Sequence, residues 1–162
     1  GRSAFDQAYD DLAIAALRHI AEVGGDQAVV EFARGRASEM ERRYRSLVEQ
    51  GADISQRAQL LNEALRDDGF ASTADITSEL GIQLCQHNCP IAHVAEEFPQ
   101  LCDAETEAFG RLVGTHVARL ATLSHGDGLC TTHIPLHAMN QDRPTESTDS
   151  TPPAPVAERT SA

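Results

Sequence analysis

The sequence predicts an α+β fold in which long amphipathic helices precede a small mixed domain that carries the cysteines. Apolar residues recur at helical spacing through the first 68 residues, alternation at period two begins after Gly69, and all four cysteines lie in the second half. A chain of 162 residues forms about one core. With two Tyr, five Phe and no Trp, that core is packed by Ala, Leu, Ile and Val, which favours helices.

The first 68 residues predict three helices. The first spans residues 5–23 and ends at Gly24-Gly25, the second runs from about residue 26 to 50, and the third begins at Asp53, which forms a capping box with Gln56. Their apolar stripes are Phe5, Tyr9, Leu12, Ala13, Ala16, Leu17, Ile20 and Val23; then Val29, Ala33, Ala37, Met40, Tyr44, Leu47 and Val48; then Leu60, Leu61, Ala64 and Leu65. Two helices of this length in a short chain lead us to expect a homodimer, with a helical hairpin packed on its own domain as the alternative.

The second half predicts a hairpin over residues 70–84 that turns at Thr77-Ser78, followed by a short helix from Pro90 to about residue 98. A longer helix is expected over residues 103–123, with His116 on its inward stripe. A turn at 126–128 and a strand over 129–135 beside the hairpin follow. The predicted division is therefore 1–68 for the helical linker and dimerisation region, 69–137 for the cysteine-bearing domain and 138–162 for a disordered, Pro-, Ser- and Thr-rich tail.

Composition excludes several function classes. A net charge of −12 repels phosphate, so this chain by itself is a poor binder of nucleic acid. No apolar run is long enough to span a bilayer and no export signal is visible, so we expect no membrane partner and a cytoplasmic location. The sequence contains no phosphate-binding loop, no metalloprotease motif and no nucleophile elbow, and we expect no enzyme.

The four cysteines are the candidate chemistry. Cys85, Cys89, Cys102 and Cys130 are separated by three, twelve and twenty-seven residues. Cys89 and Cys102 are expected just before helices, where free N–H groups and the helix dipole lower a thiol pKa and favour the metal-binding thiolate. Spacing alone leaves three interpretations open: a structural zinc module, for which only Cys85 and Cys89 form the usual close pair; an iron–sulfur site, which suits the Pro directly after Cys89; and a metal-free thiol switch in which Cys85 and Cys89 pair.

Two segments carry a resemblance to a known family. Residues 85–102, CQHNCPIAHVAEEFPQLC, and residues 126–135, GDGLCTTHIP, resemble the sensor domain of SufR-type regulators. These are winged helix-turn-helix repressors that carry an iron–sulfur cluster, usually 4Fe–4S, and control the genes of the Suf cluster-assembly system. Their pattern C-x12-C-x27-C is matched by Cys89, Cys102 and Cys130, and the resemblance covers roughly residues 69–137.

The resemblance implies an iron–sulfur cofactor held by those three cysteines, with DNA binding modulated by the state of the cluster. Cys85 is the first candidate for a fourth ligand, and His133 and His116 are the alternatives. Glu96, Glu97 and Glu105 are harder ligands that suit such a site less, and Asp103 and Glu105 are expected to cap their helix.

The resemblance also implies partners. We expect a homodimer that binds operator DNA through an N-terminal winged-helix domain, which this sequence does not contain. The chain is therefore expected to be a repressor without its reader domain, with a natural short form as the alternative.

Overall fold

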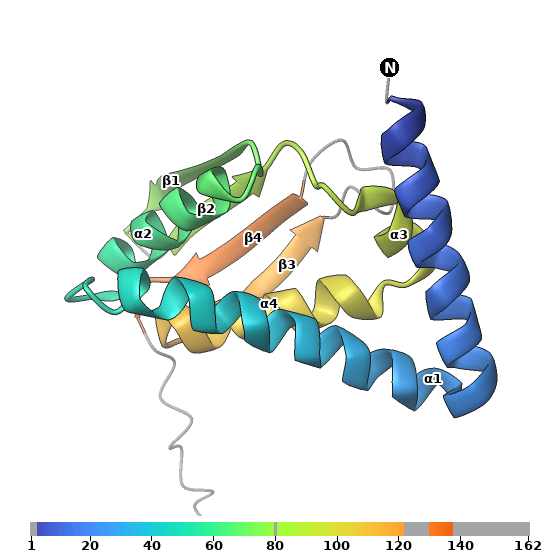
Figure 1. Ribbon diagram of the computed structural model, residues 1–162. Coiled ribbons are helices and arrows are strands. Elements are labelled where there is room, and N and C mark those ends of the chain that lie inside the picture. The colour runs from blue at the N-terminus through green and yellow to red at the C-terminus, as the bar shows by residue number, and fades with distance from the viewer. Residues whose placement is uncertain (1–2, 80, 122–129, 138–162) are drawn as a thin grey trace, which may run out of the picture.

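A computed structural model describes residues 3–79, 81–121 and 130–137 of the chain (Figure 1). The predicted α+β class is confirmed. The elements are α1 (Ala4–Val48), α2 (Ile54–Asp67), β1 (Ser72–Ser78), β2 (Gly81–Gln86), α3 (Ala92–Glu97), α4 (Gln100–Val113), β3 (Ala118–Ala121) and β4 (Cys130–Pro135).

Helix α1 consists of two arms joined by a kink at Gly25. The backbone of Gly25 has φ 72° and ψ −176°, which is not helical and which glycine adopts without a steric penalty. The N-terminal arm begins at Ser3, whose side chain accepts a hydrogen bond from the amide of Asp6. The arms run in different directions in Figure 1, so the two helices predicted on either side of Gly24-Gly25 are both present.

The C-terminal arm of α1 packs with α2 and α4 in one layer of helices. Its predicted stripe from Val29 to Val48 is buried, except that Leu47 is only partly buried. Helix α2 begins as predicted: the Asp53 carboxylate accepts a hydrogen bond from the Gln56 amide at 2.8 Å, which satisfies one of the free N–H groups of the first turn. Leu61 and Leu65 of α2 are fully buried in the same core.

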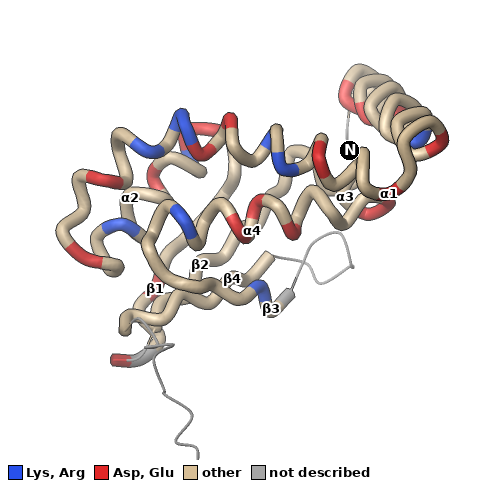
Figure 2. Tube along the Cα trace, turned by 90° about the horizontal axis from the view of Figure 1, so that it is seen from below, with Lys and Arg blue, Asp and Glu red and all other residues tan. Residues whose placement is uncertain are grey.

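The four strands form one antiparallel sheet in the order β1-β2-β4-β3, and Figure 2 shows the helices gathered on one side of it. The predicted hairpin and the strand beside it are therefore confirmed. The turn predicted at Thr77-Ser78 is wrong in position, because β1 extends to Ser78, which pairs with Gly81 at the start of β2. Ile82 and Leu84 of β2 and Ile134 of β4 are fully buried. They lie on the inner face, which is the face of the sheet toward the helices, and their outward neighbours alternate with them.

The predicted helix over residues 103–123 is wrong in extent. Helix α4 begins at Gln100 and ends at Val113, because Gly114 takes a left-handed conformation at φ 85° and its N–H bonds back to the carbonyl of Gly110. Residues 118–121 then form β3, an edge strand of the sheet, and pair with β4. Pairing with β4, a contact remote in sequence, satisfies backbone groups there, and local helical periodicity does not reveal it.

The predicted turn at 126–128 and the predicted tail over 138–162 lie outside the described residues. The core includes side chains from both sides of the boundary predicted at residue 68, among them Leu65 and Phe70. Across the described ranges, no helix combines the length and the apolar character that crossing a bilayer requires.

Candidate metal centre

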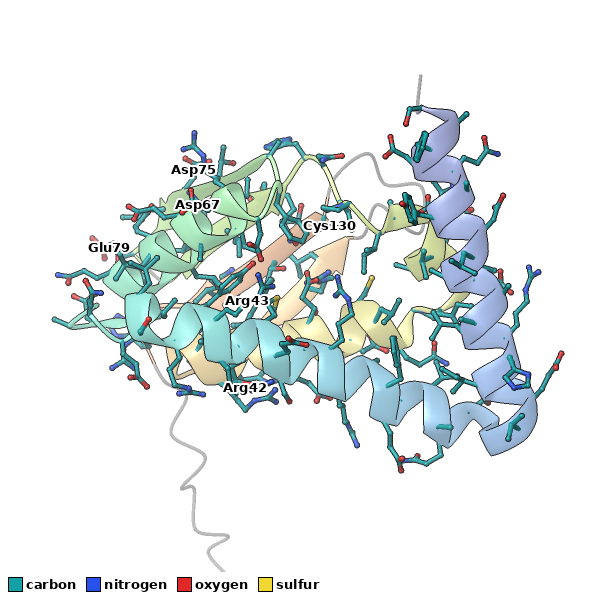
Figure 3. The ribbon with its side chains drawn as sticks, viewed as in Figure 1. Arg42, Arg43, Asp67, Asp75, Glu79 and Cys130 are labelled. Atoms are coloured by element: carbon teal, nitrogen blue, oxygen red, sulfur yellow. The ribbon has the colours of Figure 1, made fainter. Side chains whose placement is uncertain are left out.

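Three of the four cysteines come to one region from three different elements. Cys89 lies just before α3, Cys102 lies in the first turn of α4, and Cys130 is the first residue of β4. Cys102 and Cys130 are buried, and Cys89 is partly buried. Figure 3 labels Cys130 at the start of its strand, whereas the labelled Asp75 and Glu79 lie at the far edge of the sheet.

Electrostatics shows that these thiols are neighbours. Burial raises the pKa of the Cys89 thiol to about 12, and the charges of Glu105, Cys130 and Cys102 add to that rise. The N–H of Ile91 donates a hydrogen bond to Cys89, which acts in the opposite direction but is outweighed by burial. Three thiols and one carboxyl group therefore act on one another in the interior.

The prediction that a helix N-terminus lowers the pKa of Cys89 is wrong. Helix α3 is only six residues long and begins at Ala92, three residues beyond the thiol. A short helix has a small dipole at that distance, whereas removal from water penalises the thiolate directly. Cys102 does not precede its helix either, because α4 begins at Gln100.

Glu105 lies with the three thiols, although the sequence predicts that it caps its helix. It is 5 % exposed, and it does not cap α4, which has no side-chain cap. Its Oε1 accepts hydrogen bonds from Nε2 of Gln86 at 3.4 Å and from Nη2 of Arg119 at 3.2 Å. Since Gln86 is the cross-strand partner of Cys130, and Cys102 lies one turn before Glu105, the carboxylate is held close to both cysteines. In the sequence, the nearness of Glu105 to Cys102 is indicated by their three-residue spacing on a helix with an apolar face.

Unpaired polar atoms surround this carboxylate. The Oε1 of Gln86, the Nε of Arg119 and the Oγ1 of Thr132 are buried and have no hydrogen-bond partner within the described part of the chain. Gln86 and Arg119 both contact Glu105, and Thr132 is the cross-strand partner of Arg119. Buried polar atoms in proteins are nearly always paired, so these unpaired donors and acceptors are suited to a polar or charged group.

Cys85 lies on the other face of the sheet. In the register of β2 and β4, Cys85 is paired with Thr131 and Gln86 with Cys130. Because successive side chains of a strand point to opposite faces, Cys85 points away from the face on which Cys130 lies. Cys85 is also not among the groups whose charge acts on Cys89.

The two candidate histidines lie elsewhere. His133 alternates with Thr132 and Ile134 and so faces away from the helices, where its ring lies against the backbone of Gly81. His116 is exposed in the connection between α4 and β3, so the expectation that it lies on an inward helical stripe is wrong. His116 lies outside the helix because α4 ends at Val113.

The site is open toward the N-terminal arm of α1. Cys89 and Pro90 line a groove of about 520 Å³ together with Asp6, Tyr9 and His93. The segment that carries Cys89 therefore lines one groove with a helix that begins about eighty residues earlier in the chain.

Within residues 3–79, 81–121 and 130–137, no three His, Cys, Asp or Glu side chains are close enough together to hold a single metal ion. A single zinc ion binds its ligands at about 2.0–2.3 Å, which requires a tight group of donors. A cluster of several irons and sulfides is wider and separates its ligands further. The donor set of three cysteines and one carboxylate is thus a group of neighbours rather than a closed single-ion site.

Comparisons with known proteins give no relatives: no family model matches the sequence, and no curated protein or solved structure is significantly similar to the chain.

Proposed function

We propose that the chain is the iron–sulfur sensor part of a dimeric, cytoplasmic transcriptional repressor of the SufR type, which controls Suf genes and is not an enzyme. The observation that supports it most is the convergence of Cys89, Cys102 and Cys130, the same three cysteines that match the C-x12-C-x27-C pattern. Operator DNA would be bound by a winged-helix domain outside this sequence. That division of labour agrees with the net charge of −12 on this chain.

The donor set fits an iron–sulfur cluster, which would supply iron for the thiolates to bind and a redox-sensitive group. Cys89, Cys102 and Cys130 would hold it. The raised pKa of Cys89 means that its thiolate is unfavourable without a positive partner, and iron is such a partner. The buried guanidinium of Arg119 adds positive charge near a group that would be anionic overall.

The arrangement favours Glu105 over Cys85 as the fourth ligand. Glu105 is buried beside the other three, whereas Cys85 lies on the opposite face of its strand. A carboxylate binds iron of a cluster less well than a thiolate does, so the iron at Glu105 would be lost first to an oxidant or chelator. A labile position is useful in a sensor.

Ligation would connect three elements to one another: the segment before α3, the first turn of α4 and the start of β4. Because ligand bonds would hold these three residues together, binding would contribute to the stability of that arrangement. Loss would release the Cys89 segment, which borders Tyr9 of α1. The position of the N-terminal arm is therefore coupled to the state of the site, and this coupling is the route to the DNA-binding domains.

The first experiment is iron, sulfide and zinc analysis with absorbance spectra, on protein purified without oxygen. We expect iron, sulfide and the broad visible absorption of thiolate-ligated iron. Cys102→Ser should lose this absorption, whereas Cys85→Ser is the matched control and should retain it. Glu105→Gln should load a cluster that a chelator removes at least ten times faster than from the unchanged protein.

Three results would contradict the proposal. Stoichiometric zinc without iron would favour the structural zinc module. Protein without metal, in which mass analysis finds a Cys85–Cys89 disulfide after mild oxidation, would favour the thiol switch. Loss of the cluster from Cys85→Ser, together with an unchanged rate of chelator removal from Glu105→Gln, would contradict the assignment of the fourth ligand and return that position to Cys85.

A further inference from the structure

The two arms of α1 enclose a cavity beside the kink. In Figure 1, α3 and the start of α4 lie inside the angle between the arms. The cavity measures about 170 Å³ and is lined by residues of each: Leu17 and Ile20 of the N-terminal arm, Phe32 of the C-terminal arm, Val94 of α3 and Leu101 of α4. Because it lies in the bend of α1, we call it the elbow cavity.

The elbow cavity is apolar and of a size that suits a small molecule. Leu17, Val94 and Leu101 are 3 %, 5 % and 5 % exposed and form its floor, whereas Phe32 at the rim is 45 % exposed. Protein interiors are close-packed and contain few voids larger than a water molecule. An apolar cavity of about 150 Å³ binds benzene, so the elbow cavity is suited to an apolar group of about six to eight carbon atoms.

A single charged group lines this apolar cavity. Arg36 is the one charged side chain among the described residues that line it, and it lies one helical turn after Phe32, at the exposed rim. No carboxylate in the part of the chain that the structure describes forms an ion pair with Arg36, whereas Arg18 of the other arm is paired with Glu97. The guanidinium of Arg36 is therefore free to bind an anionic group of a ligand.

The charge of that group is limited by the single arginine. A guanidinium binds a carboxylate through two parallel hydrogen bonds, and the one negative charge of a carboxylate matches it. A phosphate monoester carries nearly two negative charges at neutral pH, which one arginine does not balance on a chain with a net charge of −12. A carboxylate is thus the complementary head group.

The size of the cavity also distinguishes a small molecule from a protein partner. A specific protein interface covers on the order of 800 Å² on each partner, which is much more than the wall of a cavity this small. A small molecule, by contrast, needs only a concave apolar site with one or two polar groups that fix its orientation.

We propose that the elbow cavity binds a small monocarboxylic acid, whose apolar body lies on Leu17, Val94 and Leu101 and whose carboxylate pairs with Arg36. Aliphatic and aromatic acids of this size share that chemistry. The inference goes beyond the proposed function, and it holds whether or not the chain binds a cluster.

Such a ligand would contact both arms of α1 and α3 at once, and would therefore favour one angle at the Gly25 kink. Ile91 also lines the cavity, and its N–H donates a hydrogen bond to Cys89. Binding in the elbow cavity would thus act on the segment that carries a thiol of the candidate metal centre.

The test is isothermal titration calorimetry of the full chain at pH 7 with four compounds. Benzoate and hexanoate are the acids, and benzyl alcohol and hexanol are their neutral counterparts. The acids should bind with dissociation constants below about 1 mM, and the alcohols at least ten times more weakly.

Two arginine variants test the role of the charge. Arg36→Gln should weaken binding of both acids at least ten-fold, to the level of the alcohols, and should leave the alcohols unchanged. Arg34→Gln is the matched control, because Arg34 is an exposed arginine of the same arm that does not line the cavity. It should bind the acids as the unchanged chain does.

Two alanine variants test the location. Ala16 lines the cavity from an exposed helix position, so Ala16→Leu should fill part of the void and weaken binding of all four compounds at least ten-fold. Ala15→Leu is the control, since Ala15 is equally exposed on the same arm but does not line the cavity. Leucine is a good helix former, so both variants should fold.

Four results would overturn the proposal. They are the absence of binding of either acid at concentrations up to about 10 mM, equal affinity for acids and alcohols, equal effects of Arg36→Gln and Arg34→Gln, and equal effects of Ala16→Leu and Ala15→Leu. Sedimentation of the same variants tests the other occupant. If the unchanged chain were a dimer that Ala16→Leu alone dissociates, a second copy would occupy the cavity, and the proposal would likewise be wrong.

Discussion

Glu105 and Arg119 form a buried ion pair that joins α4 to the edge strand β3. Nη2 of Arg119 lies 3.2 Å from Oε1 of Glu105, and the two side chains are 9 % and 7 % exposed. The guanidinium also lies 5.8 Å from the centre of the Phe109 ring, where a cation is attracted by the ring face. Because so little solvent surrounds the pair, removal of one partner leaves the other charge buried and unpaired, which strongly destabilises the fold.

Replacement of Arg119 by Met should destabilise the metal-free protein by about 3 kcal/mol, because it leaves the Glu105 carboxylate buried without its counterion. Glu105→Gln in the same chain should recover part of that loss, since the amide carries no charge. Urea unfolding of the single and double variants measures both effects. Purely additive losses would mean that the two side chains do not stabilise each other.

The stability of the metal-free protein should fall as the pH rises from about 9 toward 12. The folded-state pKa of Cys89 is about 12, above its ordinary value of 9.0, so the unfolded chain loses this proton first. The contribution of Cys89 is present below pH 9 and is lost as the pH rises to its folded-state pKa. With allowance for its partial exposure, the loss is on the order of 2 kcal/mol.

Chemical unfolding at pH values from 7 to about 11 measures this effect, and Cys89→Ala is the control. Glu105, Cys102 and Cys130 face the same thiol and remain in that variant, so the difference between the two proteins isolates Cys89. Parallel pH profiles for the two proteins would show that the Cys89 pKa is not raised.

Gly25→Ala should destabilise the protein by about 2 kcal/mol, because φ 72° with ψ −176° is a conformation essentially limited to glycine. Gly35→Ala is the opposite case. Gly35 lies within the helical C-terminal arm and an added Cβ there meets nothing within 4 Å, so the change should stabilise the protein by about 0.5–1 kcal/mol. Thermal unfolding of the two variants measures these opposite changes in stability. If Gly25→Ala were neutral, the kink would not depend on glycine.

Tyr44→Phe should cost about 1.5 kcal/mol, because the Tyr44 hydroxyl donates to Oδ2 of the Asp68 carboxylate and thereby links α1 to the end of α2. Burial and the hydrogen bond to Asp68 raise the pKa of this phenol. Nη2 of Arg43 also lies 3.0 Å from Oδ2 of Asp68, and this ion pair should hold the carboxylate in place in the variant. Urea midpoints provide the measurement, and Tyr9→Phe, at a position that is 66 % exposed, should shift them by less than 0.5 kcal/mol.

Local patterns predicted most of the fold. Gly25 and Asp53 mark element ends through their own backbone or side-chain chemistry, and the stripe from Val29 to Val48 is long enough for its helical period to be unambiguous. Residues 118–121 were predicted incorrectly because a short strand at the edge of a sheet is determined by its partner, β4, and not by its own sequence.

The residues of the candidate site were also predicted only in part. The resemblance to SufR-type regulators singles out Cys89, Cys102 and Cys130, and these are the three thiols that the fold brings into one region. Spacing also ranked Cys85 above Glu105, because four residues are few along the chain. Along a strand, however, successive side chains point to opposite faces. Gln86 is the residue that pairs with Cys130, so Cys85, its neighbour in the strand, points to the other face.

The sequence by itself determined the helices, the hairpin, the acidic charge and the three spaced cysteines, because each of these depends on residues close together or on composition. Only the tertiary structure decided that Glu105 is buried beside the thiols, that burial raises the pKa of Cys89, and that five of the eight residues of the first apolar stripe remain exposed. Burial is a property of what packs against a residue, and for these residues the packing partners come from distant parts of the chain.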